Sequence, residues 1–167
     1  MFCTVLNRLK SPTNVGMIVR SHVAFGGQQV VFIGDDKPWE FRKGSQSFSR
    51  KLEAQCELIF LPDDDAFFVW AAQHDYQTVA IEIDAQAKPL HAFDFPSRAA
   101  LIVGHEAFGI APEFLARCDH SVFIPQFGAA ACLNVAVSCS IAQYECTRGQ
   151  GGVQTMNGAK FVGILPE

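Results

Sequence analysis

The sequence lacks any uncharged apolar run near the roughly 20 residues that cross a bilayer. Its first residues also lack the basic segment, apolar stretch and cleavage site of a secretory leader. We therefore expect a soluble, cytoplasmic protein. Charged residues make up only 18% of the 167 residues and hydrophobic residues 49%. This balance is typical of a globular domain and excludes a disordered chain.

Cysteines at zinc-binding spacing are also absent. Zinc sites usually bring ligands together at spacings of two to four residues. The six cysteines are instead scattered: Cys3, Cys56, Cys118, Cys132, Cys139 and Cys146. We expect reduced thiols that pack as small hydrophobic side chains, and no metal site.

Several familiar catalytic motifs are missing. The segment from Gly104 to Gly109 begins like a phosphate-binding loop, but Ile110 and Ala111 replace the Lys-Ser/Thr pair that contacts phosphate and magnesium. No paired-histidine zinc motif, dinucleotide-binding glycine fingerprint or G-x-S-x-G nucleophile elbow occurs. These absences argue against several enzyme classes: P-loop nucleotide enzymes, zinc proteases, Rossmann dehydrogenases and α/β-hydrolases.

Positive charge is scarce, and the formal net charge is −4. This value argues against a protein that coats nucleic acid by bulk attraction. The charge is unevenly distributed, however: residues 37–51 carry five cations against one anion, and residues 52–95 carry nine acids against one lysine. Such polarity could give a basic RNA-facing patch beside an acidic flank, although a solvated helix face is the more common origin of a charge run.

Short apolar runs alternate with amphipathic segments, which predicts an α/β fold with a mostly parallel sheet flanked by helices. The expected strands cover residues 2–6, 29–33, 57–61, 78–83, 99–103 and 120–124. The expected helices cover residues 13–25, 45–54, a stretch that starts at residue 62, and 134–147. The length predicts a single domain over 1–167, and the glycines after residue 148 predict that 149–167 form a loosely attached C-terminal segment.

Three separated segments carry the strongest functional signal. The first reads Asn-Val-Gly-Met-Ile-Val-Arg over residues 14–20, and the second reads Leu-Ile-Val-Gly-His-Glu-Ala-Phe-Gly-Ile over residues 101–110. The third reads Ile-Pro-Gln-Phe-Gly over 124–128 and continues as Cys-Leu-Asn-Val-Ala-Val-Ser over 132–138. In this order and spacing they resemble the three signature motifs of the SpoU/TrmH-type RNA 2′-O-ribose methyltransferases, a branch of the SPOUT superfamily.

The resemblance implies a fold and an activity. Members of this family have an α/β fold whose C-terminal part forms a deep trefoil knot, bind S-adenosylmethionine in the knot, and usually form homodimers through the adjacent helices. The implied partner is RNA, with tRNA favoured and rRNA possible. A non-catalytic RNA-binding protein of the same fold and a small-molecule enzyme on a similar scaffold remain the alternatives.

By motif position, the resemblance implies catalytic roles for Arg20, Asn134, Glu106 and Asn14. An arginine stays protonated at neutral pH, so Arg20 suits a phosphate better than the role of a base. Asn134 could hold Arg20 or a substrate oxygen, and it could equally cap the last helix. Glu106 could orient Arg20, shape the cofactor loop or serve as a structural carboxylate. Asn14 could brace the site or be an ordinary residue of the first helical turn.

The implied cofactor pocket lies in the loops after residues 103 and 124 and in the turn over 129–134. Its expected residues are Val103, Gly104, Glu106, Gly109, Ile124, Gln126, Phe127, Gly128, Cys132 and Leu133. Many relatives have Ser where this chain has Cys132, so a hydroxyl that could bond the substrate is replaced by a weakly bonding thiol. The glycines could equally shape turns, and the apolar side chains could belong to the core.

The RNA contacts must come from the surface of the domain itself, because no appended RNA-binding module is recognisable. The candidate phosphate contacts are Arg8, Lys10, Arg42, Lys43, Arg50 and Lys51. Each could equally be an ordinary solubilising side chain. A reacting 2′-hydroxyl is the feature that distinguishes RNA from DNA.

Overall fold

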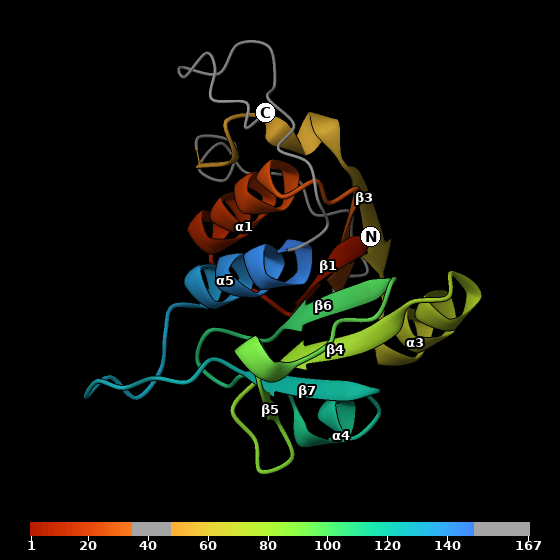
Figure 1. Ribbon diagram of the computed structural model, residues 1–167. Helices are drawn as coiled ribbons and strands as arrows, with labels where there is room; N and C mark the ends of the chain where they lie inside the picture. Colours follow the sequence, from red (N-terminus) through yellow and green to blue (C-terminus); the bar gives the residue numbers. More distant parts are fainter. Residues whose placement is uncertain (35–47, 149–167) are drawn as a thin grey trace, which may run out of the picture.

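A parallel sheet of seven strands forms the centre of the computed structural model, which describes residues 1–34 and 48–148 (Figure 1). The strands lie in the order β3-β2-β1-β6-β4-β7-β5, and every neighbouring pair is parallel. Their bounds are Phe2–Asn7 (β1), Gln29–Ile33 (β2), Glu57–Leu61 (β3), Gln77–Ile81 (β4), Lys88–Pro89 (β5), Ala99–Val103 (β6) and His120–Phe123 (β7). The predicted α/β class is confirmed.

Helices cover both faces of this sheet. The α-helices are Pro12–Ala24 (α1), Asp64–Gln73 (α3), Pro112–Leu115 (α4) and Val135–Thr147 (α5), and the 3-10 helices are Leu52–Gln55 (η1) and Leu90–Ala92 (η2). Helices α1 and α5 lie side by side on one face, and α3 and α4 pack against the other (Figure 1). Alternate strand residues therefore enter two separate cores, as buried parallel strands require. In β6, Leu101 and Val103 face α1 and α5, whereas Ala100 and Ile102 face α3 and α4.

Polar side chains start the three long helices where the sequence predicts them. Ser11, Asp63 and Asn134 each accept a hydrogen bond from a backbone amide of the first helical turn. Such caps satisfy amides that have no partner inside the helix. Three predicted strands, 29–33, 57–61 and 99–103, match the observed bounds.

The helix expected over residues 45–54 is interrupted in the part that the structure describes: residues 48 and 49 are helical, but the helix does not continue through Arg50 and Lys51. Arg50 and Lys51 have φ angles of 55° and 62°, which interrupt any right-handed helix there. Only the short η1 follows. Residues 35–47 and the expected C-terminal segment 149–167 lie outside the described residues. Elements β5, η2 and α4 span two to four residues, too few to give a periodic pattern.

The cysteines are free thiols that differ in burial, and Cys56 and Cys118 are half-buried. Cys3, Cys139 and Cys146 are buried, as predicted, whereas Cys132 is exposed, which corrects the expectation for that residue. Within residues 1–34 and 48–148, no three His, Cys, Asp or Glu side chains are grouped so that they could hold a metal ion. The same residues contain no helix with the length and apolarity needed to span a membrane.

His22, on α1, is fully buried where α1 packs against β1 and α5. Gln143 Nε2 donates to the Thr4 hydroxyl at 3.0 Å, and that hydroxyl lies 2.8 Å from His22 Nδ1. The ring is buried away from solvent, which disfavours its charged form. Burial lowers the pKa of His22 from 6.5 to about 4. The folded protein therefore resists protonation of this ring in mildly acidic solution.

This depressed pKa predicts acid-sensitive stability. Between pH 6.5 and 4 the unfolded chain binds a proton at residue 22 that the folded chain does not, so stability falls as the pH falls. We expect His22 to account for about 2 kcal/mol of the loss between pH 7.5 and 5.0. Urea unfolding at both pH values checks this expectation. His22→Asn should lose less stability than the wild type across this interval, and His91→Gln, at an exposed histidine, should behave like the wild type.

Candidate active site

A cavity of about 230 Å³ opens at the carboxyl ends of β4, β6 and β7. Open parallel α/β sheets generally bind ligands at this edge. Its walls come from segments that follow these three strands and from the start of α5. Eight residues predicted for the cofactor pocket line it: Val103, Gly104, Glu106, Gly109, Ile124, Gln126, Cys132 and Leu133. The second and third motif segments are therefore brought together, although 13 residues separate them in the sequence.

Two predicted pocket residues do not line this cavity. The side chain of Phe127 is 98% exposed. A Cβ atom placed on Gly128 would meet nothing within 4 Å, so that glycine lies in open space. Both residues follow Gln126 on the loop that leaves β7 toward solvent.

A tight backbone hairpin shapes one wall of the cavity. His105 N donates to Gly109 O at 3.0 Å, and Gly109 N donates to His105 O at 2.8 Å. A Cβ atom on Gly104 would lie 2.3 Å from the carbonyl carbon of Gly109, which no side chain can accommodate. Gly109 itself has a φ angle of 67°, in the left-handed region that favours glycine. Both glycines are therefore required by the backbone path that forms this wall.

A chain of hydrogen bonds joins the three motif segments at the rim of the cavity. The carboxylate of Glu106 accepts from the backbone amides of Lys10 at 3.1 Å and Ser11 at 2.8 Å. The same carboxylate accepts from Asn14 Nδ2 at 3.1 Å, and Asn134 Nδ2 donates to Asn14 Oδ1 at 3.1 Å. The start of α1, the loop after β6 and the start of α5 are thereby fixed to one another.

The direction of each bond in this chain follows from the chemistry of its members. An ionised carboxylate only accepts, so Asn14 must present its NH₂ group to Glu106 and its oxygen to Asn134. Asn134 must then present its own NH₂ group to Asn14. Its oxygen is left to accept from the amides of Ala136 at 2.9 Å and Val137 at 3.4 Å, which caps α5. Asn134 therefore serves as helix cap and network member together.

The hydrogen bonds also change the acidity of Glu106. Burial alone would raise the pKa of this carboxyl, but the amides of Lys10 and Ser11 and the side chain of Asn14 outweigh it and lower the pKa. Glu106 is therefore ionised at neutral pH, and it is a weak general base because its pKa is lowered and its oxygens already accept three hydrogen bonds. Its contacts instead show a carboxylate that positions the start of α1.

Arg20 lies outside this network. It is exposed on α1, and no ion pair or hydrogen bond joins it to another residue in the described ranges. Glu106 is bonded to Asn14 and to the loop before α1, and Asn134 is bonded to Asn14 and α5. Within one chain, neither of the two residues expected to orient Arg20 forms a hydrogen bond or ion pair with it.

The candidate RNA contacts have different surroundings. Arg8 NH1 lies 2.8 Å from Asp64 and donates to Asn7, so this guanidinium is already engaged. Lys10 is exposed. It lies beside the cavity, because its backbone amide donates a hydrogen bond to Glu106, which lines the cavity. Arg50 and Lys51 are exposed and precede β3, at the opposite end of the strands from the cavity. Arg42 and Lys43 lie outside the described residues.

Sequence reasoning missed one wall of the cavity. Ile81, Glu82 and Ile83, at the end of β4, line it. The Glu82 carboxylate accepts from the amides of Ile83 at 2.8 Å and Ile110 at 3.0 Å, and so ties the hairpin to β4. No motif covers these residues. The available signal was their place at the end of the strand predicted over 78–83, but the sequence does not show that β4 neighbours β6 and β7.

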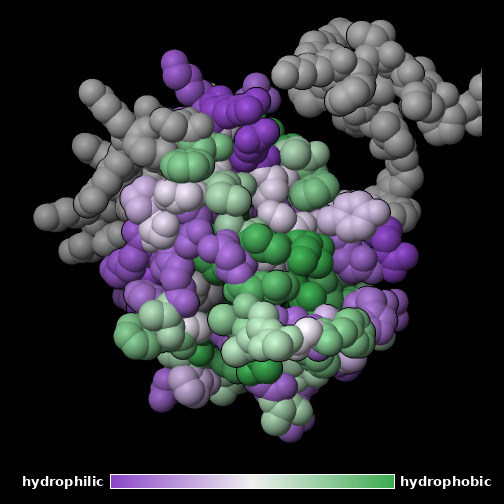
Figure 2. Space-filling model, turned by 90° about the vertical axis from the view of Figure 1, so that its left-hand side faces the viewer, coloured by the Kyte–Doolittle hydropathy of each residue, from purple (hydrophilic) through white to green (hydrophobic). Residues whose placement is uncertain are grey.

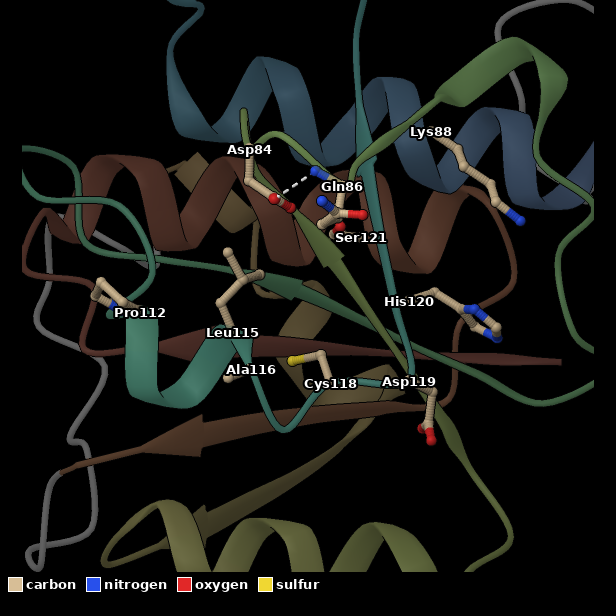
Figure 3. Close-up of a pocket in the computed structure, with 10 residues that line it drawn as sticks. All are labelled: Asp84, Gln86, Lys88, Pro112, Leu115, Ala116, Cys118, Asp119, His120 and Ser121. Atoms are coloured by element: carbon tan, nitrogen blue, oxygen red, sulfur yellow. Dashed lines mark hydrogen bonds between the residues drawn. The ribbon is translucent and has the colours of Figure 1, made fainter.

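A larger hollow, of about 520 Å³, lies between β7, α4 and the loop after β4 (Figure 3). Its polar groups are largely bonded within the protein. Asp84 accepts from the amide of Gln86 at 2.7 Å, Asp119 accepts from the amide and hydroxyl of Thr78, and His120 Nε2 lies 3.0 Å from the side chain of Gln77. None of the motif residues lines this hollow. The smaller cavity is therefore the better candidate site.

These features define an α/β protein with a ligand site at the carboxyl edge of a parallel sheet. The chain belongs to the SpoU rRNA Methylase family, whose model matches residues 1–144. This membership agrees with the resemblance carried by the three motif segments.

Individual proteins that resemble this chain are methyltransferases or were studied for RNA methylation. The chain is 25% identical to the 23S rRNA (guanosine-2′-O-)-methyltransferase RlmB of Acinetobacter baylyi over 148 residues, 88% of this chain and 59% of the relative. The AdoMet-bound rRNA methyltransferase of Sinorhizobium meliloti matches 90% of this chain and 57% of its own, with a TM-score of 0.83 and 23% identity. A structure on 2-OH methylation of C/U34 on tRNA matches 90% of this chain and 96% of its own, with a TM-score of 0.78 and 24% identity. The chain thus spans less than two thirds of the first two relatives.

Proposed function

We propose that this protein transfers the methyl group of S-adenosylmethionine to a ribose 2′-hydroxyl of RNA, with tRNA favoured and rRNA as the alternative. The observation that carries the proposal is the Glu106-Asn14-Asn134 chain, because it joins all three motif segments at the rim of one cavity. The relatives named as 2′-O-methyltransferases support the reaction. The match over nearly the whole length of the structure concerned with tRNA favours that substrate.

The cavity residues fit the proposed cofactor. When bound, S-adenosylmethionine supplies a methyl group on a positively charged sulfur. Val103, Ile124 and Leu133 offer apolar walls for an adenine ring or the methionine chain. Gln126 Oε1 is buried without a hydrogen-bond partner among the described residues, so it is available to an amino group of the ligand.

The reaction requires the ribose oxygen, the methyl carbon and the sulfur to be aligned, and the hydroxyl proton to be lost. Positioning supplies much of the rate. We assign Arg20 to a phosphate of the target nucleotide, because its planar guanidinium matches two phosphate oxygens. The bound phosphate can then orient the 2′-hydroxyl and accept its proton, which Arg20 itself cannot do.

We propose further that the active site is completed in a homodimer. Four exposed apolar side chains lie along the outward faces of α1 and α5: Met17 (41% exposed), Val137 (40%), Ile141 (37%) and Tyr144 (54%). Residues 137, 141 and 144 recur at helical spacing, and α1 and α5 are joined by a hydrogen bond between Ser21 and Ser140. Figure 2 shows hydrophobic side chains gathered on the side of the molecule where these helices and the loops at the cavity lie.

Arg20 lies one helical turn from Met17, so it borders the same apolar surface. Pairing two such surfaces about a two-fold axis would bury them and carry each Arg20 to the partner chain. This arrangement accounts for an arginine that belongs to a motif and yet forms no hydrogen bond or ion pair with the described residues of its own chain.

We also propose the trefoil knot expected for the C-terminal part. The strand order supports it: after β5 at the sheet edge, the chain returns to form β6 between β1 and β4, and then crosses β4 again to form β7. Helix α5 then comes back across β6 and β4. A knot there would make this chain an exception among proteins, which rarely thread themselves.

The double role of Asn134 predicts that two substitutions will differ. Asn134→Asp keeps the oxygen that caps α5 and loses the NH₂ group that binds Asn14, so stability should stay near that of the wild type while methyl transfer falls at least tenfold. Asn134→Ala removes both and should also cost about 1 kcal/mol of stability. Thermal unfolding and transfer assays on both variants check this prediction. Equal activity of wild type and Asn134→Asp would contradict the role of the network.

The function is tested by incubating the protein with methyl-labelled S-adenosylmethionine and, separately, total tRNA and rRNA. Label in alkali-resistant dinucleotides is the expected result, because methylation blocks the 2′-hydroxyl that alkali cleavage needs. Label that enters bases would contradict the ribose as acceptor. Binding of RNA without any transfer would instead identify a non-catalytic RNA-binding protein.

A further inference from the structure

Two phenylalanine rings are far more exposed than the other large apolar side chains that the structure describes. Phe127 is 98% exposed and Phe108 is 84% exposed, and the next, Ile83, is 60% exposed. Burial of one such ring stabilises a protein by about 1.5–3 kcal/mol. Two rings left in water on neighbouring loops therefore indicate a surface that meets a partner.

Both rings stand beside the candidate active site, on loops from different strands. Phe108 lies at the tip of the hairpin between His105 and Gly109, which follows β6 and forms one wall of the cavity. Phe127 comes directly after Gln126, which lines the cavity from the end of β7. The space around the neighbouring Gly128 is open. The two rings thus lie on loops that border the cavity proposed to receive the substrate ribose.

The ring of Phe108 has a partner on one side. The His105 ring lies 4.9 Å from it, tilted by 35°, and His105 Nδ1 is fixed by the amide of Ala107 at 3.0 Å. This support restrains the Phe108 ring while most of its surface stays open. A restrained flat ring loses little conformational entropy when a second flat group stacks on it.

We propose that Phe108 and Phe127 are stacking platforms for nucleobases of the RNA strand that delivers the target ribose. This inference rests on the proposed function and assigns part of its substrate-binding surface. Nucleobases unstacked from a helix are commonly bound on aromatic side chains. The charges around the cavity favour the same contact: among the described residues, Glu82 and Glu106 line it, the exposed Lys10 bonds Glu106 through its backbone amide, and the chain carries a net charge of −4. Beyond the phosphate assigned to Arg20, these charges offer little attraction for the RNA backbone, so stacking adds affinity for the flanking bases.

The test measures RNA binding without methyl transfer. The probes are a fluorescein-labelled, mixed-sequence single-stranded RNA of 12 nucleotides and unfractionated tRNA, titrated with the full chain and followed by anisotropy. Phe108→Ala and Phe127→Ala should each raise the Kd about tenfold, as expected for the loss of one stacked base. The salt dependence of Kd should not change, because no phosphate contact is lost.

Matched variants isolate the flat ring. Phe127→Tyr keeps it and should bind RNA within about twofold of the wild type, whereas Phe127→Leu stays apolar, loses the ring and should bind like Phe127→Ala. Val69→Ala is the surface control, because Val69 is 56% exposed on α3, on the other face of the sheet. It should leave the Kd unchanged.

Three results would overturn the inference. An unchanged Kd in both alanine variants means that the rings do not contact RNA. A change from dimer to monomer in light scattering means that they pack against a second chain, and a loss of S-adenosylmethionine affinity in calorimetry means that they cover the cofactor. The failure of this inference can be distinguished from the failure of the proposed function. Ring-dependent RNA binding without ribose methylation contradicts the function alone, and methylation with unchanged binding by the ring variants contradicts the stacking alone.

Discussion

Arg20→Ala is expected to lower methyl transfer at least about a hundredfold while the Kd for S-adenosylmethionine stays within about twofold of the wild type. The reason is that Arg20 is exposed on α1 and is not among the residues that line the cavity. Its removal therefore leaves the cofactor site intact and removes only the group that positions the target phosphate. Single-turnover assays with saturating RNA and calorimetry with the cofactor measure the two effects separately.

The control for this prediction is another exposed arginine. Arg117 pairs with Asp65 at 2.7 Å, on the opposite face of the sheet from α1 and α5. Arg117→Ala should transfer methyl groups at the wild-type rate. Arg20→Lys keeps the charge and loses the planar fork, so it should restore only a small part of the activity. Wild-type activity in Arg20→Ala would refute the assignment.

Gly104→Ala is expected to weaken binding of S-adenosylmethionine at least tenfold. The added Cβ atom would lie 2.3 Å from the carbonyl carbon of Gly109, so the hairpin must open. The clash is with backbone, which cannot move aside as a flexible side chain could. The two hydrogen bonds between His105 and Gly109 would be lost together with one wall of the cavity. Calorimetry measures the affinity, and circular dichroism checks that the sheet remains folded.

Gly128→Ala is the matched control, because a Cβ atom at that position meets nothing within 4 Å. It lies on the other loop beside the cavity and should leave the cofactor affinity unchanged. Equal affinity in wild type and Gly104→Ala would mean that the hairpin is not a wall of the cofactor site.

The elements that could be predicted from the sequence are those whose signal is local. Strands β2, β3 and β6 are short apolar runs bounded by turn residues, and their predicted bounds match the structure. The starts of α3 and α5 carry acceptor side chains, Asp63 and Asn134, that fix the first turn. The interruption by Arg50 and Lys51 could not be predicted, because residues of their type adopt positive φ angles only when the tertiary structure imposes them.

The candidate site was predictable only as far as the motifs reach. They identified eight lining residues and the three members of the hydrogen-bond chain. They did not identify Glu82, whose role depends on β4 lying beside β6 and β7. They also could not show that Glu106 bonds the amides of Lys10 and Ser11, since partners about 95 residues apart depend on the strand order.

The central claim is that Arg20 of one chain serves the cavity of another. It is tested by mixing Arg20→Ala protein with Asn134→Ala protein after unfolding and refolding the two together, each variant alone being nearly inactive. If the site is shared between chains, half of the dimers are mixed and each has one intact site, so about one quarter of wild-type activity returns. Activity no higher than that of the separate variants would contradict the account, because it would mean that both residues act from the same chain.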